Sequence, residues 1–405
     1  MNTVSSEVDR LKKVIVHRPD DGIEVITPDN ALKFLYDDIV YLPLMQKEHD
    51  TFTKVLEHFV GEKNVLDTYN LLVDNILENK NNNTKKLIDY VVDLENCTDE
   101  VCEILYNLKG EELAYTLFTG IYRKTGELIL RPLPNYVFTR DIGVVINDYV
   151  LICNASKKAR TRESILTRYI IYFHPEFKHF QANNDAKIID MTRKCDDCTI
   201  EGGDVMMLGN THLLVGCSER STPEAFESLK EEVFRKNVIE NLVRIVIAKD
   251  RSSMHIDTLF TQISENEYVI YEDTLKSDII KITLYTKNGG RKEFSTLEEF
   301  FLDYNPNMKF ILCGDGDETF AAREQWTDGC NLVAVKNGVA ISYFRNTRTA
   351  KALEKAGYKI VHADEFLKEL PNPDSVEKTI VAISSTELSR ARGGPHCMTF
   401  PIWRG

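Results

Sequence analysis

The chain has 405 residues, and its 43% hydrophobic and 28% charged composition suits a folded protein with a sizeable core rather than a disordered chain. Its 63 acidic and 50 basic residues give a formal net charge of −13, which disfavours nucleic acid and anionic membranes as partners. The sequence has neither a membrane-spanning apolar run nor a signal peptide, and its nine cysteines lack framework spacing, so we expect a cytoplasmic protein.

The N-terminal third predicts one α/β unit interrupted by helices. Apolar runs at 11–19 and 64–67 predict strands, and 42–59 has the pattern of a helix between them. From 69 to 125 apolar residues recur at three- and four-residue steps without a strand signal, which predicts about four helices with a loop at 81–84. We therefore expect one catalytic domain over 1–405, with an all-helical insertion at 69–125.

From residue 143 onward one pattern recurs four times, with two apolar runs around a short polar turn of hairpin type. These pairs span 143–153, 205–217, 259–272 and 332–344. Helix-like stretches follow at 159–172, 223–236 and 348–356, and further apolar runs lie at 187–190, 243–248 and 358–361. The helix at 223–236 has a clear start, with Thr222 as N-cap and Pro223 in the first turn. The repeat predicts a closed array of strand–strand–helix–strand units, with an ordinary α/β fold as the alternative.

Polar residues stand just ahead of the first strand in three of these units. Asp141 precedes the first hairpin, Glu201 and Asp204 flank a Gly-Gly turn before the second, and His255 and Asp257 precede the third. Each residue alone would ordinarily be a solvated turn residue or a structural histidine. Equivalent positions of a closed array converge on one axis, so together they predict a site.

Cys397 adds a nucleophile to this set. It follows Gly-Gly-Pro-His, a flexible stretch that can present a thiol rather than bury it in an element. Paired carboxylates are the best partners for a planar guanidinium, whose carbon is a poor electrophile and needs a thiolate. A histidine can protonate departing ammonia and then deprotonate water. The combination predicts chemistry on a guanidino group.

Two weaker patterns predict no metal site. Cys195 and Cys198 form a lone CxxC without a second ligand pair, which favours a loop over zinc. The acidic stretch at 314–329 lacks the residue order of a calcium-binding loop.

Several motifs resemble those of bacterial arginine deiminases, nearly from end to end. They are HRP (17–19), QKEHD (46–50), FTRD (138–141), EGGD (201–204), ERST (219–222), HIDT (255–258), REQW.DG.N (323–331) and RGG.HCMT.PI.R (392–404). The resemblance implies an α/β fold, the five-bladed propeller of ββαβ units called the pentein fold, with a helical insertion. It implies hydrolysis of L-arginine to L-citrulline and ammonia through a covalent cysteine intermediate, without metal or cofactor, by a homodimer or homotetramer of the guanidino-group-modifying superfamily.

The resemblance also assigns roles. Cys397 is the expected nucleophile, His255 the acid and base, and Asp141 and Asp257 the guanidinium clamp, while Glu201 supports His255. The expected substrate-binding residues are Asn135, Phe138, Arg160, Asp204, Arg220 and Arg392, with Asn135, Arg160 and Arg220 at the amino-acid head of the substrate. Pro395 and Phe400 depart from the pattern without removing a catalytic group.

Two alternatives remain open. One is the same chemistry on another guanidine, such as agmatine, methylated arginines or an amidine transferred to an amine. Arg160 and Arg220 argue against agmatine, which has no carboxylate for them to bind. The other is a non-catalytic arginine-binding protein, for which the full catalytic set would be unnecessary.

Overall fold

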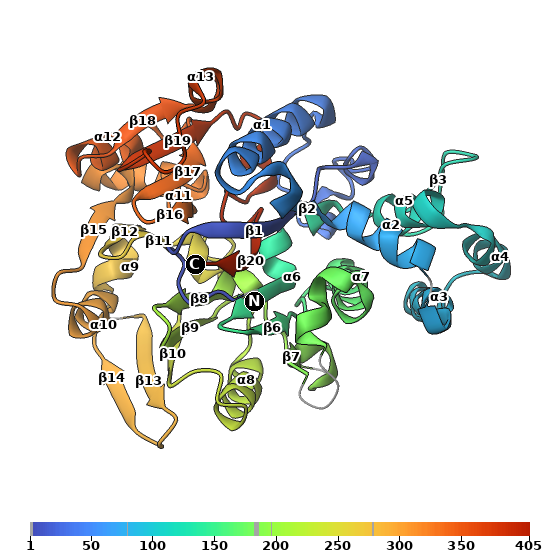
Figure 1. Ribbon diagram of the computed structural model, residues 1–405, viewed down its shortest axis with the longest axis horizontal. Helices are drawn as coiled ribbons and strands as arrows, with labels where there is room; N and C mark the ends of the chain where they lie inside the picture. The colour runs from blue at the N-terminus through green and yellow to red at the C-terminus, as the bar shows by residue number, and fades with distance from the viewer. Residues whose placement is uncertain (1–2, 79, 182–185, 196, 278) are drawn as a thin grey trace.

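The structure is a computed structural model that describes residues 3–78, 80–181, 186–195, 197–277 and 279–405 (Figure 1). Five small sheets lie around a common centre, and a group of helices projects to one side. The sheets are β20–β1–β2 (Phe400–Arg404, Leu11–Val16, Val65–Asp67), β5–β6–β7 (Gly143–Ile146, Tyr149–Ile152, Ile188–Asp190), β8–β9–β10 (Val205–Leu208, His212–Cys217, Asn241–Val246), β11–β12–β15 (Phe260–Ser264, Glu267–Ile270, Lys309–Leu312) and β16–β17–β19–β18 (Val333–Lys336, Val339–Tyr343, Thr379–Ile383, Lys359–His362).

Each sheet repeats the same pairing. Its first two strands are antiparallel and its second and third are parallel, which a helical crossover permits. The connecting helices include α1 (Leu42–Val60), α7 (Thr161–Phe173), α8 (Pro223–Arg235), α10 (Leu297–Tyr304), α12 (Thr347–Lys355) and α13 (Ala363–Glu369). The fold is therefore the expected α/β array of five ββαβ units.

The predicted hairpins and helices are confirmed, including the start of α8. The Thr222 side chain accepts a hydrogen bond from the backbone N–H of Ala225, as an N-cap should. The predicted helices of the insertion are α2 (Thr68–Glu78), α3 (Asn83–Glu95), α4 (Asp99–Asn107) and α5 (Gly110–Thr119). That the chain forms a single catalytic domain with 69–125 as its insertion stays a prediction.

Some expectations about elements were wrong. The loop expected at 81–84 ends early, because α3 begins at Asn83, and a short hairpin of β3 (Ile121–Tyr122) and β4 (Glu127–Leu128) ends the insertion. The run at 358–361 forms β18, but β19 lies between it and β17. A further hairpin, β13 (Lys281–Thr286) and β14 (Arg291–Phe294), extends the third sheet.

Two other features bear on the expectations from sequence. Cys195 and Cys198 lie in a loop, as expected, and their thiols form a disulfide that the sequence did not predict. Within the described residues, no helix combines the length and the apolar character needed to cross a membrane.

Candidate active site

The polar residues ahead of the strands come together at the centre of the array. Asp141 lies in the short helix α6 (Thr139–Ile142) before β5, Glu201 precedes β8, His255 and Asp257 precede β11, and Cys397 precedes β20. All five are buried. The structure therefore joins residues that are up to 256 positions apart in the sequence (397 − 141).

The Gly-Gly turn after Glu201 allows this approach. A Cβ atom on Gly202 would lie 2.0 Å from the carbonyl oxygen of Arg140, and one on Gly203 would lie 2.7 Å from Nδ1 of His255. Neither glycine has a positive φ, so space rather than backbone conformation requires them. The two glycines let three segments of the site pack without intervening side chains.

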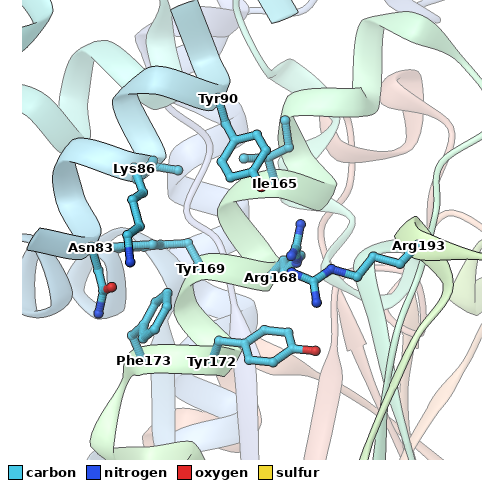
Figure 2. Close-up of a pocket in the computed structure, with 10 residues that line it drawn as sticks. Asn83, Lys86, Tyr90, Ile165, Arg168, Tyr169, Tyr172, Phe173 and Arg193 are labelled. Carbon is cyan, nitrogen blue, oxygen red and sulfur yellow. The ribbon is translucent and has the colours of Figure 1, made fainter. Parts of the chain in front are cut away.

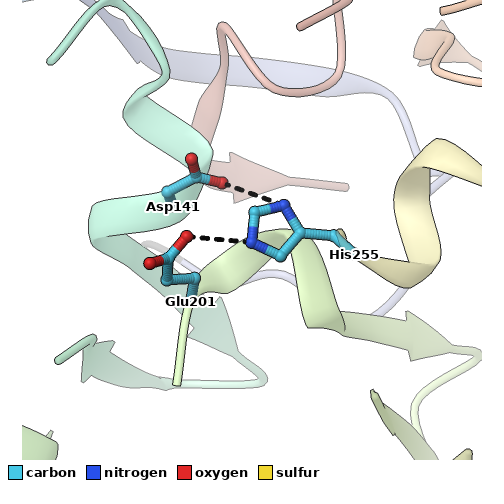
Figure 3. A group of neighbouring side chains, drawn as sticks. All are labelled: Asp141, Glu201 and His255. Carbon is cyan, nitrogen blue, oxygen red and sulfur yellow. Dashed lines mark hydrogen bonds and ion pairs between the residues drawn. The ribbon is translucent and has the colours of Figure 1, made fainter. Parts of the chain in front are cut away.

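His255 lies between two carboxylates (Figure 3). Its Nε2 is 2.9 Å from Oε2 of Glu201, and its Nδ1 is 3.8 Å from Oδ1 of Asp141. Burial alone would lower the pKa of His255, but the surrounding carboxylates of Asp141, Glu201 and Asp204 outweigh burial and raise it to about 10. The imidazole is thus held as a cation that can give up a proton.

Cys397 faces the carboxylate of Asp257. Its Sγ is 3.5 Å from Oδ2 of Asp257. Burial, followed by the charges of Asp257 and Asp141, raises the pKa of the Cys397 thiol well above its ordinary value. A cation placed between the thiol and these carboxylates would offset that effect and favour the thiolate.

Asn331 positions the nucleophile and was not singled out from the sequence. Its Oδ1 accepts a hydrogen bond of 3.0 Å from the backbone N–H of Cys397, and its Nδ2 donates one of 3.0 Å to the carbonyl of Asp257. Asn331 precedes β16, the place that the other site residues occupy in their own units. That equivalence, within the REQW.DG.N motif, was the signal that could have identified it.

Behind Asp257 lies a buried charged network. His396 Nδ1 is 2.9 Å from Oδ2 of Asp257, and its Nε2 is 3.4 Å from Oε2 of Glu7. Arg140 Nη2 lies 3.6 Å from the same oxygen of Glu7. Burial would raise the pKa of Asp257, but His396 lowers it below its ordinary value. Asp257 therefore stays ionised beside the thiol.

Arg160 is buried and pairs with acids of the site, while its expected role at the substrate head stays a prediction. Its Nη1 is 2.7 Å from Oδ2 of Asp141 and 3.2 Å from Oε2 of Glu201, while its Nε donates to Glu163 over 2.9 Å. Its guanidinium thus contacts one of the carboxylates expected to clamp the substrate. Arg220 Nη1 lies 3.6 Å from the same oxygen of Glu201.

The remaining expected substrate residues are held by other groups. Asn135 Nδ2 donates to the carbonyl of Phe34 over 2.8 Å, and Phe138 packs against Gly393, where a Cβ would lie 2.2 Å from the ring. The guanidinium of Arg392 stacks on Trp326, with its carbon 3.4 Å from the ring centroid. Phe138 thus packs against the loop that carries the nucleophile, and Arg392, at the start of that loop, packs it against Trp326.

Both carboxylate oxygens of Asp204 accept hydrogen bonds from neighbouring protein groups, and its expected contact with substrate stays a prediction. Its Oδ2 accepts hydrogen bonds of 2.6 Å from both Ser218 and Ser221, and its Oδ1 accepts one of 3.0 Å from the backbone N–H of Ile256. Burial raises the pKa of Asp204 to about 6. The residue ties the segment before α8 to the segment that bears His255 and Asp257.

Asp141, Glu201 and His255 have the spacing of a metal site, since one donor atom from each lies within 4.8 Å of the others. The donor set fits a metal ion less well than the spacing suggests. Arg160 already pairs with both carboxylates at ion-pair distance. A divalent ion would have to displace this guanidinium, so the local charges favour an organic cation of the same kind.

Comparison with known proteins agrees with this geometry. The family model of arginine deiminase matches residues 33–404. The arginine deiminase of Listeria monocytogenes serovar 1/2a is 33% identical over 430 residues, which cover 99% of this chain and 97% of that protein. The arginine deiminase of Borrelia garinii subsp. bavariensis is 31% identical over 432 residues, with the same coverage.

Solved structures share the fold at lower identity. The N-terminal domain of ArgZ, an arginine dihydrolase from the ornithine-ammonia cycle in cyanobacteria, has a TM-score of 0.54 and 15% identity, with 98% of each chain covered. The DDAH of Pseudomonas aeruginosa in complex with citrulline has a TM-score of 0.53 and 13% identity, covering 96% of this chain and 99% of that one. These neighbours support the five-unit architecture, and the nearly complete matches in sequence show that this chain belongs to the arginine deiminase family.

Proposed function

We propose that this chain hydrolyses L-arginine to L-citrulline and ammonia through a covalent intermediate on Cys397. The observation that carries the proposal is a buried thiol facing Asp257, with His255 held between Asp141 and Glu201 close by. Two carboxylates and a thiol suit a guanidinium, because the carboxylates bind its N–H groups while the sulfur reaches its carbon.

The first half of the reaction begins when the substrate guanidinium lies between Asp141 and Asp257. Its positive charge offsets the carboxylates that raise the pKa of Cys397, so the thiol releases its proton to solvent water and the thiolate attacks the guanidinium carbon. A carbon–sulfur bond forms. His255 donates its proton to the departing nitrogen, the carbon–nitrogen bond breaks, and ammonia leaves an amidino-thioether on Cys397.

The second half reverses these roles. His255, now neutral, removes a proton from water, and the resulting hydroxide attacks the same carbon. The carbon–oxygen bond forms, and the carbon–sulfur bond breaks with its electron pair going to sulfur. The hydroxyl proton returns to sulfur through solvent, which restores the Cys397 thiol as neutral citrulline is released, and His255 is again protonated. Glu201 supports His255 in both steps, because its carboxylate stabilises the imidazolium at 2.9 Å.

Other guanidines and simple arginine binding are the competing functions. Arg160 and Arg220 were expected to select arginine over agmatine, yet both contact Glu201 in this structure. Head-group selection therefore requires these guanidiniums to reorient toward the substrate carboxylate, and we keep it as part of the proposal. An arginine-binding protein would show affinity without product.

A ureido assay on the purified chain tests the proposal. Arginine, agmatine and methylated arginine are incubated in parallel with the wild type, Cys397→Ser and the control Cys102→Ser, a half-buried thiol in the insertion. We expect the wild type to form citrulline from arginine, with at least about a hundredfold higher kcat/KM for arginine than for agmatine. Cys102→Ser should remain active and Cys397→Ser should be inactive. Product from Cys397→Ser, or arginine binding without any product from the wild type, would contradict the proposal.

We further propose that the protein is a cytoplasmic homo-oligomer, as a homodimer or homotetramer. Light scattering measures its mass at working concentration, and cell fractionation measures its location. A monomer mass throughout the tested concentrations contradicts the assembly without bearing on the reaction.

A further inference from the structure

A cavity lies between the helical insertion and the α/β array, away from the residues of the active site. It measures about 250 Å³ and lies between α3 and α7, with Arg193 at its edge (Figure 2). Asn83, Lys86, Leu87 and Tyr90 contribute from α3, and Ile165, Arg168, Tyr169, Tyr172 and Phe173 from α7. None of these residues has a part in the proposed reaction.

The cavity is positively charged in a chain with a net charge of −13. Arg168 and Arg193 share one carboxylate, since their Nε atoms lie 3.1 and 3.5 Å from the same oxygen of Asp190. Among the residues that the structure describes, Lys86 has no ion-pair partner, and no acidic side chain lines the cavity. Three cations thus face one carboxylate, an excess that a doubly charged anion would balance.

Aromatic rings form the walls. Tyr90 is 56% exposed and Phe173 is 44% exposed, although both are large rings on helices that pack together. Figure 2 shows these rings on different sides of the cavity, with Arg168 and Arg193 extending toward each other near Tyr172. Each of the two guanidinium carbons lies 5.7 Å from the Tyr172 ring centroid. Small-molecule sites are lined mainly by apolar and aromatic side chains with a few placed polar or charged groups, and this cavity has both kinds of lining.

We propose that this cavity binds a small planar ring that carries a phosphate group, such as a nucleoside monophosphate. The ring packs against Tyr90 and Phe173, and the phosphate faces Arg168 and Arg193, whose planar forks bind phosphate oxygens in pairs. Lys86 adds a third positive charge. The volume limits the ligand to a compact molecule, since pockets for drug-sized ligands measure roughly 300–1,000 Å³, and the negative charge of the whole chain disfavours a polyanion.

Calorimetric titration of the full chain with AMP at low ionic strength tests the site. We expect a dissociation constant below about 1 mM, with adenosine and inorganic phosphate each at least about tenfold weaker, because each lacks half of the recognised groups. Lys86→Ala and Arg193→Ala should each weaken AMP binding several-fold. Lys85→Ala is the matched control, because it removes an exposed neighbouring charge of α3 that does not line the cavity.

Four results would overturn the inference. The first is no binding of AMP, and the second is inorganic phosphate binding as tightly as AMP. The third is equal affinity for AMP in Lys86→Ala, Arg193→Ala and the control Lys85→Ala. The fourth is displacement of AMP by arginine, which would locate the ligand in the active site. Tyr90→Ala provides an independent check, since it should weaken AMP binding and leave the mass of the protein unchanged. A change in that mass would make this face an interface between copies and overturn the inference as well.

Discussion

Arg160 brings a positive charge into a group of three buried acids. It contacts Asp141, Glu201 and Glu163, and all four side chains are nearly inaccessible to solvent. Burial raises the pKa of Glu163 to about 7. Burial would also raise the pKa of Glu201, but Arg160 and other nearby cations outweigh it and lower that pKa. Since buried charges are stable only when paired, this guanidinium supports the site whether or not it also contacts substrate.

Arg160→Ala should therefore destabilise the protein in a manner that depends on pH. At about pH 8 the variant holds unpaired buried carboxylates, and such a loss typically costs ~3–5 kcal/mol of unfolding free energy. The folded pKa of Glu163 lies above its ordinary value even with Arg160 present, and loss of that cation raises it further. The neutral form is therefore favoured in the fold of the variant, so as pH falls Glu163 binds a proton and the penalty shrinks. Urea unfolding at pH 8 and at about pH 5.5 measures both values.

Arg235→Ala is the matched control for this prediction. Arg235 is 65% exposed and pairs with Glu232 on the surface of α8, where such pairs contribute about 0–1 kcal/mol. The prediction fails if Arg160→Ala loses no more unfolding free energy than Arg235→Ala, or if its loss stays constant with pH. Either result would show that the buried acids do not depend on Arg160.

Asp257→Asn should lower the pKa of the Cys397 thiol. The carboxylate lies 3.5 Å from Sγ. Burial is the largest cause of the raised pKa, and the charge of Asp257 is the next largest. Without its charge the thiolate forms at lower pH, while arginine turnover drops by orders of magnitude because the guanidinium loses a clamp. Ultraviolet absorbance of the thiolate, referenced to Cys397→Ser, follows the titration. An unchanged titration curve would show that Asp257 does not raise this pKa and would leave burial and Asp141 as its causes.

The residues of the site were partly accessible from sequence. Cys397, His255 and the acids before each strand stand at equivalent positions of repeated units, and that pattern survives in a linear chain. Glu163 and the bonds of Asn331 were missed, because their significance lies in tertiary contacts with Arg160 and Cys397. The contacts of Arg160 with Asp141 and Glu201 were missed for the same reason.

At the scale of elements, local patterns predicted hairpins and helices, whereas distant pairing escaped prediction. β20 contains Pro401 and pairs with β1, whose residues are more than 380 positions away, so no local signal marks it. β19 has its own strand signal in the apolar run Thr379–Ile383, and it was missed because the repeat had already assigned the third strand of this unit to 358–361. Its place between β17 and β18 follows only from the order of strands in the sheet. The Gly-Gly turn before β8 is a case in which a short motif did carry tertiary information.

Gly202→Ala should abolish activity by separating two segments of the site. The added methyl would lie 2.0 Å from the Arg140 carbonyl oxygen, a backbone atom that cannot rotate away, so Glu201 and Asp141 must move apart. Gly126→Ala is the control, because nothing lies within 4 Å of its added Cβ and it bears only the strain of a φ of 76°, roughly 1–2 kcal/mol. Citrulline formation and circular dichroism compare the two. Normal turnover by folded Gly202→Ala would show that the close approach is dispensable.

For the molecule as a whole, the array closes through strands from opposite ends of the sequence. β20 is the first strand of the sheet that β1 and β2 complete. At the end of β20 the backbone N–H of Arg404 also donates to the carbonyl of Thr3 over 2.7 Å. Arg404 is buried and its Nη1 donates to the carbonyl of Asp9 over 2.8 Å. Closure therefore depends on hydrogen bonding and packing between the two ends of the described chain, and a covalent link there should be compatible with the fold.

A circular permutant tests this dependence. Its original ends are joined by a flexible linker of about six residues, which spans on the order of 13 Å, and new ends are opened between Asn288 and Gly289, in the exposed turn of β13 and β14. We expect cooperative unfolding and citrulline formation within about a factor of three of the linear chain, because every strand keeps its partners. The matched comparison is the linear chain without residues 400–405, which leaves β1 unpaired on one edge and removes Arg404 from the interior; it should lose cooperative unfolding. An inactive permutant together with an active truncated chain would reverse this account, since β20 would then be dispensable and the order of the chain essential.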